Sequence, residues 1–133
     1  MRPDEDVELA KDWHRYAAVD IEAALGCLSR PRADGLVIAF HCQQAVEKAY
    51  KGALALHGQE VARTHDLVKL EATLAKLGLV APVEAALLED LTRFAIDDKY
   101  PRMRAAPITR DEAAALIPAA QLAVDWLAGL LAA

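Results

Sequence analysis

Apolar side chains return every three or four positions along the first quarter of the chain. This spacing follows one face of an α-helix, so it predicts a long amphipathic helix from about residue 4 to residue 29. The acidic residues 4 to 6 suit the positive end of the helix dipole. Arg30-Pro31-Arg32 ends the helix, because proline lacks an N–H donor and restricts the residue before it. The apolar stripe consists of Ala10, Trp13, Ala17, Ile21, Ala24 and Leu28.

The next two segments also have helical patterns with recognisable ends. One runs from about residue 34 to residue 56 and stops at Gly58, a residue that readily adopts the left-handed conformation after a helix. The other runs from about residue 65 to residue 77, with Thr64 as its predicted N-cap and Gly78 after its last turn.

Two more helices complete the predicted fold. Pro82 suits the first turn of a helix that reaches residue 95, and the polar, proline-broken segment DDKYPRMRAAP (97–107) follows as a long loop. Thr109 and Glu112 form a capping box for a last helix to about residue 132, which Pro118 is expected to kink. The chain is therefore predicted to be an all-α, antiparallel up-and-down bundle of four to five helices.

Composition agrees with one domain covering residues 1–133. The chain has 133 residues, of which 55% are hydrophobic and only 5% aromatic, as in closely packed helices. Its net charge of −5 argues against a protein that coats nucleic acid through bulk electrostatics.

Neither the polar start nor the interrupted apolar tail is typical of a membrane segment, so we expect a soluble cytoplasmic protein. Cys27 and Cys42 lack metal-ligand spacing, and we expect neither a metal nor a cofactor.

The second predicted helix carries two kinds of surface. A projection at 100° per residue places a broad apolar arc on one side, while the other side mixes charged and amide side chains with apolar ones. The polar side has two interpretations: a solvated face with the i, i+4 pair Glu47 and Lys51, or a surface that meets a second copy or a ligand. The predicted dimer or cleft surface comprises Phe40, His41, Gln43, Gln44, Glu47 and Leu54.

Three ordered segments resemble the HEPN domain family. They are FHCQQAVEKAYKGAL (40–54), THDL (64–67) and KYP (99–101), and the resemblance spans most of the chain. It implies an antiparallel bundle of four or five helices that is usually a homodimer and is commonly encoded beside a minimal nucleotidyltransferase.

The resemblance also directs attention to a catalytic motif. Many members are metal-independent ribonucleases or toxins with an Arg, four to six residues, and a His, followed two residues later by a Tyr in the branch paired with nucleotidyltransferases. No histidine of this chain follows an arginine at that distance, but Arg93, Asp98 and Tyr100 keep the frame. An unperturbed aspartate is ionised at pH 7, so it cannot donate a proton and would repel a phosphate. We therefore expect no ribonuclease activity.

Alternatives remain open for these residues. A buried Asp98 with a raised pKa would act as a general acid. In a purely structural interpretation, Arg93 pairs with Asp97 or Asp98 at the helix end. The THDL segment has a local interpretation, with Thr64 and Asp66 at a helix start, and a catalytic one through His65.

The resemblance further implies that Tyr100 accepts AMP from the partner enzyme. Basic side chains would bind phosphates if the second helix and the KYP loop lie together, and would otherwise be solvated. They are Lys48, Lys51, Lys99, Arg102 and Arg104. The leading hypothesis is a HEPN-domain homodimer that partners a minimal nucleotidyltransferase and faces a nucleotide or RNA. The alternatives are a ribonuclease toxin of a toxin–antitoxin pair and an interaction module without a ligand.

Overall fold

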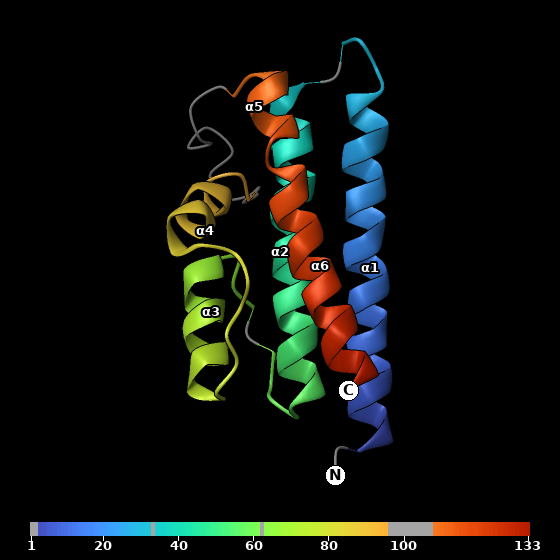
Figure 1. Ribbon diagram of the computed structural model, residues 1–133, viewed down its shortest axis with the longest axis vertical. Coiled ribbons are helices and arrows are strands. Elements are labelled where there is room, and N and C mark those ends of the chain that lie inside the picture. The colour runs from blue at the N-terminus through green and yellow to red at the C-terminus, as the bar shows by residue number, and fades with distance from the viewer. Residues whose placement is uncertain (1–2, 33, 62, 96–107) are drawn as a thin grey trace.

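A computed structural model describes residues 3–32, 34–61, 63–95 and 108–133, and this part of the chain is helical with no strand. Figure 1 shows α1 and α2 as long antiparallel helices, with α5 and α6 along one side of them and α3 and α4 beside α2. The all-α bundle is thereby confirmed. The helices are α1 (Asp4–Leu28), α2 (Gly35–Leu56), α3 (Leu67–Lys76), α4 (Ala85–Thr92), α5 (Arg110–Ala114) and α6 (Ile117–Ala132).

The central helix of the bundle is α2, which contacts all five other helices. Small residues let α1 approach it closely: Ala10, Ala17 and Ala24 are spaced by seven, and all three are completely buried. At Gly52 the two backbones are so close that a Cβ atom would lie 3.0 Å from Trp13 Cβ and 3.5 Å from Ala10 O. This narrow seam brings polar side chains of α1 within reach of α2.

Several predicted helix ends are confirmed. Asp34 caps α2, Gly58 and Gly78 follow α2 and α3 with φ values of 70° and 79°, and Thr109 and Glu112 form the capping box of α5. Hydrogen bonds from the backbone and side chain of Thr109 lower the pKa of the Glu112 carboxyl.

Two other ends differ from the prediction. The N-cap of α3 is Asp66, whose carboxylate accepts from Val68 N and Lys69 N, whereas Thr64 Oγ1 accepts from Asp66 N at 3.1 Å. Asp66 therefore displaces Thr64, because its side chain reaches two helix N–H groups. The helix expected from Pro82 begins at Ala85, after an extended Glu84.

The last predicted helix is divided into α5 and α6 near Pro118. Proline occupies the first turn of α6, where its missing N–H costs least, so the predicted kink becomes a break between two helices. The span Arg110–Ala132 contains an 18-residue window with a mean hydropathy of 1.6, so by length and composition alone it could cross a membrane. Ala113, Ala120 and Ala123 of this span belong to the core of the bundle, while 28% of the apolar window as a whole is buried.

Gly35 provides a test of how tightly the start of α2 is held. A Cβ atom there would clash with Ile108 O and lie 2.7 Å from Thr109 O, both backbone atoms. Gly35→Ala is therefore expected to lower the free energy of unfolding by about 2–3 kcal/mol. The matched control is Gly26→Ala in α1, where a Cβ meets nothing within 4 Å and should stabilise the helix by about 0.5–1 kcal/mol. Urea unfolding followed by circular dichroism measures both, and equal effects of the two substitutions would contradict this packing.

Candidate functional site

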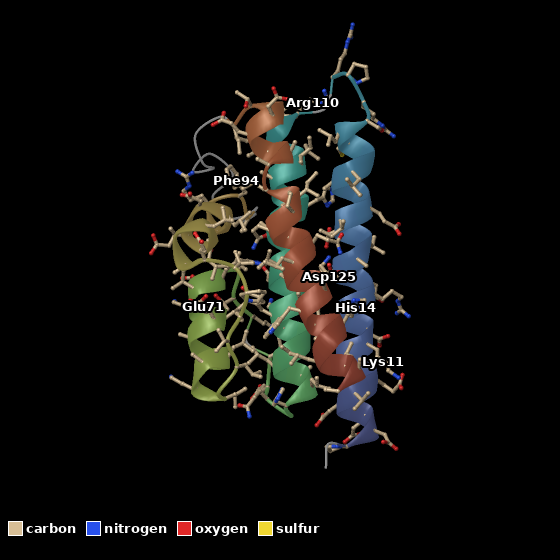
Figure 2. The ribbon with its side chains drawn as sticks, in the orientation of Figure 1. Lys11, His14, Glu71, Phe94, Arg110 and Asp125 are labelled. Carbon is tan, nitrogen blue, oxygen red and sulfur yellow. The ribbon has the colours of Figure 1, made fainter. Side chains whose placement is uncertain are left out.

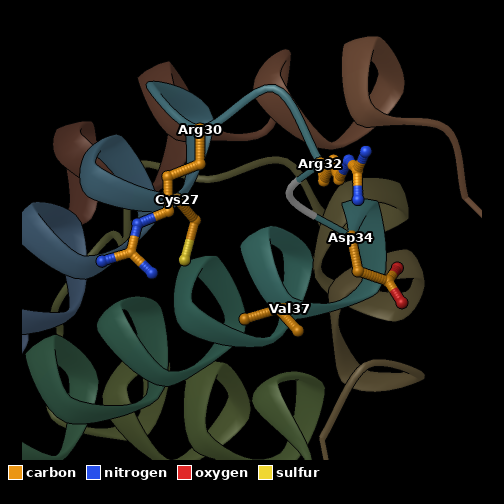
Figure 3. A pocket seen from close by; sticks show the side chains of 5 residues that line it. All are labelled: Cys27, Arg30, Arg32, Asp34 and Val37. Atoms are coloured by element: carbon orange, nitrogen blue, oxygen red, sulfur yellow. The ribbon is translucent and has the colours of Figure 1, made fainter.

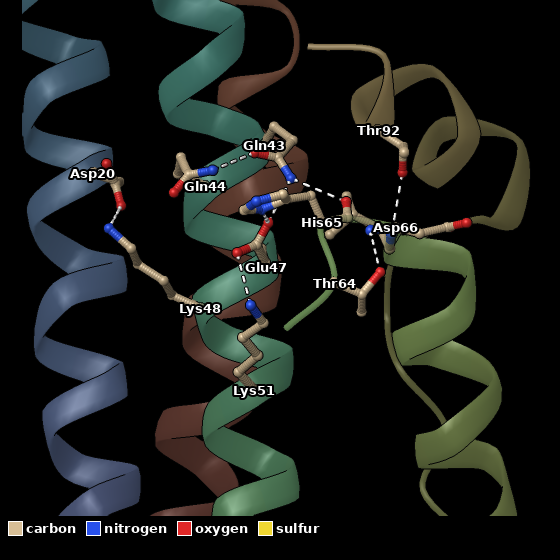
Figure 4. Close-up of polar contacts among 11 residues, drawn as sticks. Asp20, Gln43, Gln44, Glu47, Lys48, Lys51, Thr64, His65, Asp66 and Thr92 are labelled. Carbon is tan, nitrogen blue, oxygen red and sulfur yellow. Dashed lines mark hydrogen bonds and ion pairs between the residues drawn. The ribbon is translucent and has the colours of Figure 1, made fainter. Parts of the chain in front are cut away.

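The polar side of α2 forms two groups of buried contacts. We call them the Glu47 network (Gln43, Glu47, Lys51 and His65) and the Asp20 cluster (Asp20, His41 and Lys48). Figure 4 shows that the first faces the chain segment before α3, whereas the second links α2 to α1. Both depend on carboxylates that are almost fully buried, since Asp20 is 6% and Glu47 4% exposed.

Three donors surround the carboxylate of Glu47. Oε1 accepts from Gln43 Nε2 at 3.0 Å and lies 2.8 Å from His65 Nδ1, while Oε2 lies 3.0 Å from Lys51 Nζ. A carboxylate can only accept, so this contact places the hydrogen of the neutral His65 ring on Nδ1. The His65 side chain is 54% exposed, and Nε2 is then its proton-accepting nitrogen.

The buried amide of Gln43 extends this network. Its Nε2 also donates to His65 O at 3.3 Å, and its Oε1 accepts from Gln44 Nε2 at 2.7 Å. On the other side, Lys51 Nζ lies 6.0 Å from the centre of the Trp13 ring of α1. The network therefore joins α1, α2 and the segment before α3.

The Asp20 cluster joins α1 and α2 directly. Asp20 Oδ2 lies 2.6 Å from Lys48 Nζ, and Asp20 Oδ1 lies 2.9 Å from His41 Nδ1. Burial, together with the nearby charge of Asp20, raises the pKa of the Cys42 thiol to about 12. Cys42 is therefore an inert core thiol at neutral pH.

Several residues predicted to form a dimer or cleft surface lie inside the monomer. Gln43, Glu47 and Leu54 are 0%, 4% and 2% exposed, which corrects the surface position assigned to them. Lys51, a predicted phosphate ligand, is also buried and bonds to Glu47. The helical projection missed this because it cannot show that α1 and the segment before α3 cover the polar side. Phe40, His41, Gln44 and Lys48 remain partly exposed.

Asp20 and the bonded state of His65 were missed at the sequence level. A signal was present: Asp20 directly precedes Ile21 in the apolar stripe of α1, and a buried carboxylate there requires a basic partner. For His65, the neighbouring residues were interpreted only as a helix start, so its contact with the distant Glu47 was not predicted.

Arg93 lies at the exposed end of α4. Its side chain is 57% exposed, and Nη2 lies 3.7 Å from Asp90 Oδ1. Nε donates to Asp90 O at 3.5 Å, and Cζ lies 5.7 Å from the centre of the Phe94 ring. Its neighbour Thr92 accepts from Leu67 N at 3.1 Å, so the end of α4 meets the start of α3 just after His65. The other members of the predicted motif and basic set, Asp98, Lys99, Tyr100, Arg102 and Arg104, lie outside the described residues.

A recess of about 280 Å³ opens at this junction. Its lining includes the carboxylates of Asp66 and Glu89 beside Val68 and Thr92. Like charges would repel a phosphate there, so a phosphate held by Arg93 must approach from another side. In the described part of the chain, no group of three His, Cys, Asp or Glu side chains could hold a metal ion.

The pairing of Glu47 with Lys51 generates a stability prediction. Glu47→Leu leaves the Lys51 ammonium buried without its partner and should lower the free energy of unfolding by about 3–5 kcal/mol. Glu47→Leu combined with Lys51→Met removes both charges and should recover at least about 2 kcal/mol of that loss. Urea unfolding of the two single variants and the double variant measures this coupling. Purely additive losses would show that the two charges do not stabilise each other.

Comparison with known proteins agrees with this fold. A family model described as the HEPN domain matches residues 10–130. The crystal structure of TT1696 from Thermus thermophilus is similar at 31% identity and a TM-score of 0.69, covering 90% of this chain and 96% of that one. The crystal structure of ST0689, described as an archaeal HEPN homologue, is similar at 27% identity and a TM-score of 0.66, covering 92% and 97%. No curated protein matches the chain. The family match spans nearly the whole bundle, and the chain belongs to the HEPN domain family.

Proposed function

We propose that this HEPN domain is a non-catalytic binding protein that partners a minimal nucleotidyltransferase and presents a nucleotide- or RNA-facing surface around Arg93, Asp98 and Tyr100. The observation that carries the proposal is the state of Arg93, whose side chain is 57% exposed at the end of α4 and makes only long contacts, with Asp90 and with the Phe94 ring. Such a group can bind a phosphate through paired N–H donors.

Binding without cleavage follows from the residue types in the motif frame. Cleavage of RNA needs a group that exchanges a proton near neutral pH, and histidine suits this role. This chain has Asp98 at that position of the frame, and an ordinary aspartate is ionised at neutral pH. Arg93 would then hold a phosphate that nothing at position 98 can protonate.

A ribonuclease toxin of a toxin–antitoxin pair remains the second candidate, and one specific contact favours it. The buried Glu47 fixes the His65 ring through Nδ1 and leaves Nε2 as the proton acceptor, an arrangement that suits a general base. The segment that carries His65 also meets the end of α4 through Leu67 and Thr92, close in the chain to Arg93. In this version His65 replaces the missing motif histidine.

Apolar side chains on α1 support the homodimer. Leu9, Tyr16 and Val19 are each about half exposed, at 48%, 51% and 53%. A second copy packed on this side would remove that apolar surface from water.

Incubation with mixed cellular RNA in EDTA tests the absence of cleavage. Wild type should leave the RNA intact, whereas Asp98→His should cut it at least about 100-fold faster, because it restores a proton-transferring group. Asp90→His is the matched control, since it adds a histidine out of frame, on α4, and should stay inert. Light scattering of the same samples should show dimers.

Two results would contradict the proposal. Cleavage by wild type that is lost in Arg93→Ala and His65→Ala would identify the ribonuclease of the second candidate. If Asp98→His is as inert as Asp90→His, the frame of Arg93, Asp98 and Tyr100 is not a catalytic frame.

Transfer of AMP tests the partnership. Incubation with ATP, Mg²⁺ and a nucleotidyltransferase encoded beside the gene should add one AMP to the chain. The Tyr100 oxygen, deprotonated with help from the partner's metal site, would attack the α-phosphate of ATP, and pyrophosphate would leave. Intact-mass spectrometry should show this addition in wild type and in Tyr16→Phe, an exposed tyrosine of α1, but not in Tyr100→Phe. An unchanged addition in Tyr100→Phe would refute the assignment of the acceptor.

A further inference from the structure

The turn between α1 and α2 contains a second site candidate. A recess of about 350 Å³ lies there, lined by Cys27, Arg30, Arg32, Asp34 and Val37. Figure 3 shows the two arginines on either side of it, with Val37 of α2 and the Cys27 sulfur between them. This volume is within the range of small-molecule sites in proteins.

Both arginines of the recess are free to take a ligand. Neither guanidinium has a hydrogen-bonded or ion-paired partner among the described residues, whereas on α1 Arg15 pairs with Asp12 at 3.2 Å. A guanidinium carries several N–H donors in a planar fork, which matches the oxygens of a phosphate. Two such groups at one recess therefore favour an anionic ligand.

The single carboxylate of the recess is partly engaged. Asp34 Oδ1 accepts from Leu36 N at 2.8 Å as the N-cap of α2. Its second oxygen is an acceptor for a hydroxyl group. Val37, 44% exposed, offers apolar surface beside it. The recess thus combines anion-binding, hydroxyl-binding and apolar groups.

Charge along the bundle also favours this end for an anion. Acidic residues open α1 at the opposite end, where Asp4, Glu5 and Asp6 lie in the first turn. At the end with the recess, the backbone of Gly35 lies against Ile108 and Thr109, so Arg110 begins α5 beside the start of α2 (Figure 2). The Nε atom of Arg110 is buried without a partner among the described residues. The carboxylates of Asp34 and Glu112 at this end accept backbone N–H groups, and Asp111 in the first turn of α5 is exposed to solvent.

We propose that this recess binds the phosphate group of a small hydroxylated ligand, as in a nucleoside monophosphate. Arg30 and Arg32 hold the phosphate, Asp34 accepts from a hydroxyl, and Val37 with Cys27 forms the apolar wall. The site shares no residue with the surface around Arg93 and does not depend on the function proposed above.

Calorimetric titration with AMP tests the site, with inorganic phosphate as competitor and adenosine as the ligand without phosphate. Wild type should bind AMP and not adenosine, and phosphate should compete. Arg30→Gln/Arg32→Gln should bind AMP at least about tenfold more weakly, because two charge-assisted contacts are lost. The matched control is Lys11→Gln/Arg15→Gln, which changes the net charge by the same amount on exposed residues of α1 and should bind as wild type does. Arg93→Gln should also leave binding unchanged.

Alkylation of Cys27 by iodoacetamide gives a second readout. AMP should slow this reaction in wild type but not in Arg30→Gln/Arg32→Gln, whose folding circular dichroism verifies. The proposal is overturned if AMP does not bind wild type, if Arg30→Gln/Arg32→Gln binds AMP as tightly as wild type, or if Lys11→Gln/Arg15→Gln weakens binding equally. The last result would show bulk electrostatics instead of a site. Loss of binding in Arg93→Gln alone would place the phosphate at the other surface.

Discussion

The carboxylate of Glu47 can occupy the interior of this bundle only because three donors reach it. A buried charge without partners would cost several kcal/mol, which is a large part of the stability of a domain this small. Each donor comes with a structural constraint: Gln43 and Lys51 fix one face of α2, and His65 fixes the segment before α3. The contact of His65 with Glu47 thereby ties the start of α3 to α2, and the bond between Leu67 and Thr92 ties the end of α4 to the start of α3. Asp20 has the same role between α1 and α2.

This arrangement changes the meaning of the polar residues of α2. When α2 is considered alone, these side chains suggest a solvent-exposed surface or a cleft. In the bundle, most of them form hydrogen bonds or ion pairs with neighbouring side chains. What remains accessible is the outer edge of the His65 ring, part of His41 and Lys48, and the guanidinium of Arg93. Two of these accessible groups are imidazoles that a buried carboxylate holds through Nδ1, His65 by Glu47 and His41 by Asp20.

The sequence predicted the local structure better than the contacts between distant segments. The amphipathic stripe of α1, the start of α2 near Asp34, the glycines after α2 and α3 and the Thr109 capping box are set by neighbours within a few residues, and all were predicted. Thr64 was mistaken for a cap because Asp66, two residues later, competes for the same N–H groups and was assigned only to the first turn. The burial of Gln43, Glu47 and Leu54 was missed because it depends on a segment that returns alongside α2, and helical periodicity contains no information about that path.

The seven-residue spacing of Ala10, Ala17 and Ala24 has a consequence beyond close packing. Alanine has the smallest side chain that contains a Cβ atom. These alanines therefore set the distance between the axes of α1 and α2. The contacts of Asp20 with Lys48 and His41, and of Trp13 with Lys51, all span the space between α1 and α2. The least conspicuous residues of α1 thus determine whether Lys48 and His41 of α2 can reach the buried carboxylate of Asp20.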